Sequence, residues 1–227
     1  MRMKSFFIKY KVFFVGFTLL SGIILALFYN ALLPQKQLPI YQPAMVNFKL
    51  VDSSLQHVKK YHKIAPFSLV NQNGVTITDE TYRNKIYVAD FFFTTCPTIC
   101  PIMTDHMVQL QTVFKNDVAV LLLSHSVTPE IDSVAQLKKY ALEKGVLDHK
   151  WNLVTGNKKE IYNLARASYL AVQEDGDGGP YDMIHTENFI LIDPEKRIRG
   201  FYDGTNPNAI QTLIDDIEIL KSEFPEL

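Results

Sequence analysis

Apolar positions near the start of the chain form one run that is long enough to cross a membrane. Val12 to Leu33 spans 22 residues without a charge, and a helix of that length measures about 33 Å at 1.5 Å per residue. The run shows no convincing Ala-x-Ala-like cleavage site, and no cysteine follows it that could carry a lipid anchor. We therefore expect a retained transmembrane helix over residues 12–33 rather than a cleaved signal peptide.

Charged residues around this run predict its orientation. Four basic residues precede it: Arg2, Lys4, Lys9 and Lys11. No acidic residue occurs before Asp52, so the positive-inside rule places residues 1–11 in the cytoplasm. We expect a linker over 34–45 and a folded domain over 46–227. The expected protein is a single-pass protein of the cell inner membrane with its C-terminal domain in the periplasm.

The apolar pattern of the remaining chain alternates between strand-like runs and helix-like spacings. Continuous apolar runs between turn residues predict strands over 64–70, 75–78, 85–93, 117–124, 151–154, 189–192 and 198–202. Apolar residues at helical spacing predict helices over 99–114, 128–145, 157–168 and 206–224. Thr128 and Pro129 are expected to open the second of these helices, and Gly145 to end it.

This order of elements predicts an α/β fold in which helices flank a mixed central sheet. About 190 residues follow the N-terminal segment, which is enough for one domain with its own core. Six apolar residues are expected to be mostly buried in adjacent strands of this sheet: Phe91, Phe93, Val120, Leu122, Ile190 and Ile192. A pair of cysteines stands where the first long helix begins, and with it the pattern is typical of a thioredoxin-like fold, preceded by one N-terminal transmembrane helix.

The two cysteines of the chain, Cys96 and Cys100, are only four residues apart. We expect both thiols in the first turn of the helix, where free backbone N–H groups and the helix dipole lower the pKa of a cysteine. One helical turn separates them, so both sulfurs can face the same way. The pair can form a disulfide or bind one soft metal ion, for which two sulfurs suit Cu(I) and an added imidazole also suits Cu(II).

Charge argues against nucleic acid as a partner. Five of the 23 basic residues lie within the first 36 positions, which leaves 18 basic against 24 acidic residues in the rest of the chain. A nucleic-acid-binding domain needs a basic face, and this one carries a net charge of −6.

A metal held by two thiolates usually needs a third ligand from elsewhere in the chain. Six histidines are available: His57, His62, His106, His125, His149 and His185. His185 lies between an acidic loop and a predicted strand, where this type of fold brings a loop close to the start of the helix. From position alone, each of the six is more often a structural residue than a ligand.

The segment from Phe93 to Pro101 resembles the Cys-Pro-x-x-Cys-Pro signature of the Sco (SenC-like) family. Members of that family are membrane-anchored, thioredoxin-like copper proteins that help to assemble the copper A centre of cytochrome c oxidase. Ser124 to Asp132 resembles the family's Ser-x-x-Pro-Glu segment, and His185-Thr186 with the strand and hairpin that follow resembles its His-Thr strand. The resemblance covers about residues 60–225.

The resemblance implies that Cys96, Cys100 and His185 are ligands of copper, as Cu(I) or Cu(II). It also implies three kinds of partner: the copper-binding subunit of cytochrome c oxidase, an upstream copper donor or thiol reductant, and the membrane through the N-terminal helix. Family members often have Asp directly before this histidine, whereas here Ile184 occupies that position and Asp182 is the nearest acid. Whether Asp182 replaces the missing carboxylate stays open.

Other uses of the cysteine pair explain fewer of these features. A domain of this size does not need a structural disulfide, and a structural zinc site has four ligands. A peroxiredoxin-like enzyme requires Thr three residues before its reactive cysteine, where this chain has Phe93. The alternative that stays open is an extracytoplasmic thiol–disulfide oxidoreductase without a copper role, with Cys96 and Cys100 as its redox pair.

Overall fold

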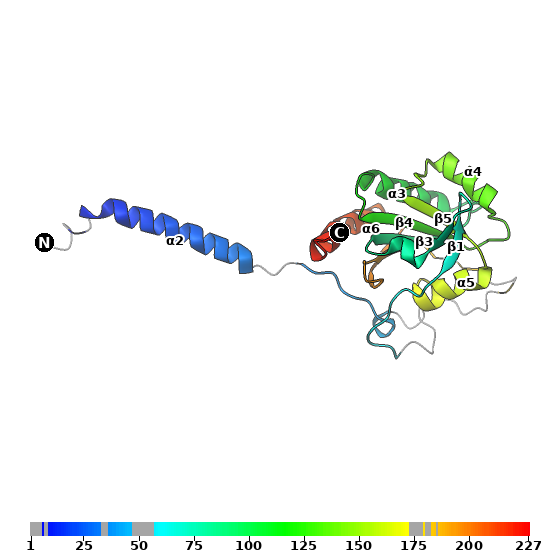
Figure 1. Cartoon of the computed structure of the whole chain (residues 1–227), viewed down its shortest axis with the longest axis horizontal. Helices are drawn as coiled ribbons and strands as arrows, with labels where there is room; N and C mark the ends of the chain where they lie inside the picture. The colour runs from blue at the N-terminus through cyan, green and yellow to red at the C-terminus, as the bar shows by residue number, and fades with distance from the viewer. Residues whose placement is uncertain are drawn as a thin grey trace. The chain divides into compact units, whose positions relative to one another are not determined.

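The computed structural model describes residues 6, 9–32, 36–46, 57–172, 179, 183, 184 and 186–227. The chain divides into two compact units, Met1–Lys36 and Gln37–Leu227. The first unit contains α2 (Lys11–Leu32), a single long helix (Figure 1). Its segment Lys11–Tyr29 has a mean hydropathy of 2.3 and is long and apolar enough to cross a membrane, as the sequence predicts.

The second unit is built on a seven-stranded sheet with the strand order β2-β1-β5-β4-β3-β6-β7. The strands are β1 (Ser68–Asn71), β2 (Thr76–Thr78), β3 (Ile86–Phe92), β4 (Val120–Ser126), β5 (Trp151–Thr155), β6 (Asn188–Ile192) and β7 (Ile198–Asp203). The central strands β3, β4 and β5 are parallel, whereas the flanking pairs are antiparallel. This arrangement confirms the mixed central sheet that the sequence predicts.

Helices cover both faces of the sheet, as Figure 1 shows. They are α3 (Ile99–Val113), α4 (Val134–Lys144), α5 (Lys158–Asn163), which continues as a π-helical turn over Leu164–Ser168, and α6 (Pro207–Glu223). Apolar residues of α3, α4 and α6 pack in one buried cluster with alternate residues of the strands, and those of α5 and the π turn pack in the cluster on the other face. Every residue of β3 is buried because both faces of a covered sheet exclude water.

Five of the six residues expected in the core are buried in β3, β4 and β6. The exception is Phe93, which is half-buried and lies just beyond the end of β3. It lies past the carboxyl-terminal end of β3, where the chain turns towards α3, rather than between the sheet and the helices that cover it.

The second predicted helix begins five residues later than expected. Ser133, not Thr128, caps α4, and its side chain accepts a hydrogen bond from Gln136 N at 3.3 Å. Residues 128–132 instead form a turn, in which the Asp132 side chain accepts hydrogen bonds from Ser126 Oγ, at the end of β4, and from Thr128 Oγ1, within the turn. The end at Gly145 is as predicted, with φ +70° in the left-handed region that glycine adopts easily.

Part of the segment expected to be a linker is packed against the folded unit. Leu38 is buried, and its carbonyl accepts a hydrogen bond from the guanidinium of Arg199 at 2.7 Å. Arg199 is itself only 2% exposed and is paired with Asp193 and Glu223. The compact unit therefore starts at Gln37, because a buried arginine that is distant in sequence holds this part of the chain.

Candidate metal centre

The two cysteines lie beyond the carboxyl-terminal end of the interior strand β3, where α3 begins. The Cys96 N–H donates to Phe93 O at 3.3 Å and closes a turn, so Cys96 precedes the helix, whose N-cap is Thr98. Cys100 is in the first turn of α3. The expectation that the first helical turn carries both thiols is thus wrong for Cys96. Both cysteines are free thiols, and their side chains hydrogen-bond to each other.

The surroundings of the two thiols shift their pKa values in opposite directions. Partial burial opposes the Cys96 thiolate, but hydrogen bonds from the backbone N–H groups of Thr98 and Cys100 outweigh it and lower the pKa of Cys96 to about 7. Burial raises the pKa of Cys100 to about 12, despite a hydrogen bond from the Phe93 N–H. The lowered pKa that the sequence predicts for the pair is therefore right for Cys96 and wrong for Cys100.

A small apolar cleft of about 220 Å³ surrounds the thiols. The described residues that line it come from three parts of the chain: Phe91, Phe93, Cys96, Pro97, Thr98, Ile99, Cys100, Val127, Ile184 and Thr186. Apart from the two cysteines, none of these residues is ionisable. The two sulfurs are consequently the most polarisable donors of the cleft, and a soft metal ion suits such donors better than a hard one.

The third predicted ligand, His185, lies outside the described residues, and so does Asp182. Ile184 and Thr186, the residues on either side of His185, both line the cleft with Cys96 and Cys100. The structure thus brings the two cysteines together with both chain neighbours of the predicted imidazole. Within the part of the chain that the structure describes, no group of three or more His, Cys, Asp or Glu side chains could hold a metal.

The other histidines have different surroundings. His106 and His62 lie 2.7 and 2.8 Å from the carbonyl oxygens of Gly204 and Ser168. His57 and His149 are exposed. His125 is fully buried in β4.

Two buried ionisable residues lie near the site: His125, which the sequence offers as one of six candidate histidines, and Asp90, which was not singled out from the sequence. Asp90 is 2% exposed, and burial raises the pKa of its carboxyl to about 7, although the Ser124 side chain hydrogen-bonds to it. The negative charge of the Asp90 carboxylate also contributes to the raised pKa of Cys100. His125 has a pKa lowered to about 4 by burial, and its ring stacks on Phe91 with centroids 4.8 Å apart. An aspartate inside an otherwise apolar strand is the sequence signal that marks Asp90.

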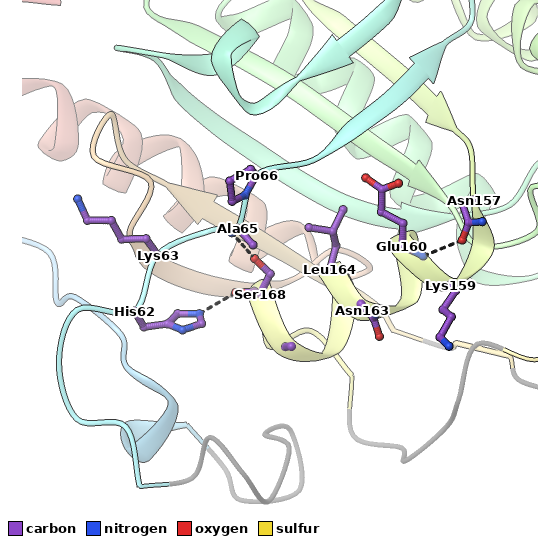
Figure 2. A pocket seen from close by; sticks show the side chains of 11 residues that line it. His62, Lys63, Ala65, Pro66, Asn157, Lys159, Glu160, Asn163, Leu164 and Ser168 are labelled. Atoms are coloured by element: carbon purple, nitrogen blue, oxygen red, sulfur yellow. Dashed lines mark hydrogen bonds between the residues drawn. The ribbon is translucent and has the colours of Figure 1, made fainter.

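A second, larger cavity of about 750 Å³ lies between residues 62–66 and helix α5 (Figure 2). Ser168 Oγ closes one side of it by accepting a hydrogen bond from Ala65 N at 2.7 Å. Glu160, its one acidic residue, accepts from Ser68 N at 3.0 Å. None of the described residues that line this cavity is a cysteine, so the thiol chemistry is confined to the smaller cleft.

Solved structures of similar proteins include metal-bound ones. The chain is 32% identical to BsSco, a member of the Sco family of cytochrome c oxidase assembly proteins in which a disulfide switch was identified; the match covers 71% of this chain and 94% of that chain, with a TM-score of 0.60. It is 27% identical to Bradyrhizobium japonicum ScoI with copper bound, over 68% of this chain and 99% of that one, with a TM-score of 0.52.

Sequence comparison gives the same relationship. The chain is 33% identical to the SCO1 protein homolog of Bacillus subtilis over 159 residues, which are 69% of this chain and 82% of that protein. The family model of SCO1/SenC matches residues 56–221. This match spans most of the folded unit and includes the turn with both cysteines, so the chain belongs to the SCO1/SenC family.

Proposed function

We propose that this protein is a copper-binding assembly factor that delivers copper to the copper A site of cytochrome c oxidase or reduces the cysteines of that site. The observation that carries the proposal is the pair of free thiols in an apolar cleft beside the chain neighbours of His185. A copper-bound ScoI and an oxidase assembly role of BsSco, both in the same family, support it.

The proposed ligands are Cys96 Sγ, Cys100 Sγ and a ring nitrogen of His185. Both chain neighbours of His185 line the cleft with the two thiols, which supports His185 as the third ligand. Two sulfurs are soft donors for Cu(I), and the imidazole is the borderline donor that also accommodates Cu(II). Copper is the cargo of this site, and its transfer requires that it be held by few ligands at an accessible edge.

The residues of the cleft prepare the thiols for the metal. Cys96, with a pKa of about 7, is substantially a thiolate at neutral pH and can make the first contact with an incoming ion. Cys100, with its pKa raised to about 12 by burial, keeps its proton until a metal replaces it. The apolar lining shields the Cys100 sulfur from water, whereas Cys96 stays partly exposed.

The second candidate function is that of a thiol–disulfide oxidoreductase, and the unequal thiols favour it specifically. The Cys96 thiolate would attack a partner's disulfide and release one partner thiolate. Cys100 would then lose its proton and displace the partner's second sulfur, which leaves a Cys96–Cys100 disulfide and a reduced partner. The reduction of a copper site's own cysteines is compatible with this chemistry, so one pair of thiols serves either role.

The proposed location follows from the N-terminal helix. With its basic residues in the cytoplasm, α2 would cross the inner membrane once and place the folded unit in the periplasm. The partners proposed there are the copper-binding subunit of cytochrome c oxidase and an upstream copper donor or thiol reductant.

Copper titration of the full-length protein in detergent tests the ligand set. We expect one copper per reduced chain, visible thiolate-to-Cu(II) absorption, and no binding once Cys96 and Cys100 are oxidised to a disulfide. His185→Ala should weaken Cu(II) binding more than Cu(I) binding, because two thiolates alone still hold Cu(I). His149→Ala is the matched control, since His149 is exposed. An unchanged Cu(II) affinity and spectrum in His185→Ala would favour the plain oxidoreductase.

A further inference from the structure

We propose that Asp132 is a positioning residue for both cysteines, which it holds in place through the backbone of the turn between β3 and α3. This inference rests on the proposed function of the thiol pair, because it names the residue that fixes the geometry of that pair. Asp132 lies in the turn between β4 and α4 and is fully buried.

The Asp132 carboxylate accepts four hydrogen bonds. Its Oδ1 accepts from Thr94 Oγ1 at 2.6 Å. Its Oδ2 accepts from Thr94 N at 3.2 Å, from Ser126 Oγ at 2.6 Å and from Thr128 Oγ1 at 3.1 Å. Two of the four donors thus belong to one residue, Thr94, which stands two positions before Cys96. A buried carboxylate with this many donors is strongly held in a single orientation.

The peptide group between Phe93 and Thr94 connects Asp132 to Cys96. Its N–H donates to Asp132 Oδ2, and its carbonyl accepts from Cys96 N at 3.3 Å. The preceding N–H, that of Phe93, hydrogen-bonds to the Cys100 sulfur. Two consecutive peptide groups therefore contact both cysteines, and Asp132 fixes the orientation of one of these groups directly.

A fixed turn matters because it sets the position of Cys96 relative to Cys100. A disulfide forms only within a narrow range of Cα–Cα and Cβ–Cβ separations, and the hydrogen bonds of the turn hold Cys96 in place. A loosened turn would hold Cys96 in a geometry suited to a disulfide for less of the time. The effect should appear in the redox equilibrium of the pair, because a disulfide that the fold positions less firmly is less stable relative to the dithiol.

The main test uses Thr94 rather than Asp132→Ala, because Asp132→Ala would leave three hydroxyl groups without an acceptor, two of them on buried residues, and is expected to unfold the protein. Thr94→Val removes one of the hydroxyls bound to Asp132 and keeps the shape of the side chain. Thr128→Val removes another hydroxyl from the same carboxylate but leaves the cysteine turn untouched. Thr94→Ser keeps the hydroxyl, which also accepts a hydrogen bond from Gln136 Nε2 at 3.0 Å.

The readouts are the midpoint potential of the Cys96–Cys100 couple, measured by equilibration of the full-length protein with a dithiol buffer, and the thermal stability. We expect both valine variants to lower the thermal stability. Only Thr94→Val should shift the thiol–disulfide equilibrium, by about fivefold towards the dithiol, the loss expected for one hydrogen bond that holds the turn in place. Thr94→Ser should return the potential to that of the unmodified protein.

Two results would overturn the inference. An unchanged potential in both Thr94→Val and Asp132→Asn, which keeps the shape of the Asp132 side chain but replaces one acceptor oxygen by a donor NH2 group, would show that Asp132 only stabilises the fold. An equal shift in Thr94→Val and Thr128→Val would show the same. The measurement needs no copper, so a protein that binds no copper would contradict the proposed function without affecting this test.

Discussion

At the scale of single residues, the two thiols differ because one is reached by backbone donors and the other is enclosed by apolar side chains. Cys96 is half-exposed, and the N–H groups of Thr98 and Cys100 stabilise its thiolate. Cys100 is 3% exposed, so its charged form loses hydration that one hydrogen bond does not replace. The order of events in either proposed function follows from this difference, because Cys96 reacts first.

Alkylation of the reduced protein should reveal this difference directly. We expect the rate of Cys96 modification by iodoacetamide to rise with pH and to reach half of its maximum near pH 7, because the thiolate is the reactive form. Cys100 should remain unmodified throughout this range. The site of modification is identified by peptide mass, and Cys96→Ser is the control that should abolish the fast reaction. Equal rates at the two cysteines would contradict the prediction.

Two buried groups on neighbouring strands should act oppositely on stability as pH changes. Burial raises the pKa of Asp90 to about 7 from an ordinary 3.8, so its contribution to stability is full at low pH and is lost as pH rises through this window. Burial lowers the pKa of His125 to about 4 from 6.5, so its contribution is full above pH 6.5 and is lost as pH falls.

When one of the two groups is substituted, the pH dependence of the unfolding free energy should be that produced by the other group. Between about pH 4.5 and about pH 6.5, Asp90→Asn should gain roughly 2 kcal/mol of unfolding free energy relative to the unmodified protein, and His125→Phe should lose a similar amount. Urea unfolding of residues 37–227 at the two pH values measures both. Parallel pH dependence in the two variants would show that these groups do not titrate as their burial indicates.

At the scale of elements, the central strands carry the core because helices cover both faces of the sheet. Leu122 in β4 is 1% exposed and packs in the cluster with α3, α4 and α6. Leu122→Ala should lower the unfolding free energy by roughly 2–5 kcal/mol through lost burial and the cavity left behind. Leu142→Ala on α4 is the matched control, because Leu142 is 71% exposed and should cost little. Chemical denaturation measures both variants, and equal losses would contradict the assigned core.

Element types followed from the sequence where local patterns decide the structure. The apolar run of β3 and the glycine after α4 predict a buried strand and a helix end, and both are present. The start of α4 did not follow, because Asp132 binds Thr94, 38 residues earlier in the chain, and no local pattern shows such a contact. The split between the pKa values of the cysteines was missed for the same reason, since it depends on how far each sulfur is buried by the tertiary fold.

The boundary of the folded unit also depends on a contact between distant residues. The proline-containing composition after α2 predicts a linker to residue 45, yet Leu38 is buried. Arg199 accounts for the difference, because its guanidinium donates to the carbonyls of both Leu38 and Pro39. Residues that belong to the folded unit therefore start close to the end of α2 in sequence, and the intervening stretch is only 33–36.

At the scale of the whole molecule, the chain combines one apolar helix with one folded unit that holds the thiol pair. Most long apolar side chains of α2 are exposed, and Thr18 satisfies its own hydroxyl by donating to Phe14 O at 2.9 Å. Both features suit a helix in lipid, where polar groups need partners within the protein. Anchorage would confine the thiol pair to the neighbourhood of other membrane-bound proteins.

The orientation of the anchor leads to the last prediction. A reporter that is active only outside the cytoplasm, fused after Leu227, should be active, because four basic residues precede the helix and retain the N-terminus in the cytoplasm. The same reporter fused before Met1 is the control and should be inactive. The active fusion should stay with the membrane fraction after a high-salt wash, since an uncharged helix of this length is held by lipid rather than by charge. Release of the folded unit into the soluble periplasmic fraction would show instead that the helix is a cleaved signal, and activity of the N-terminal fusion would show the opposite orientation.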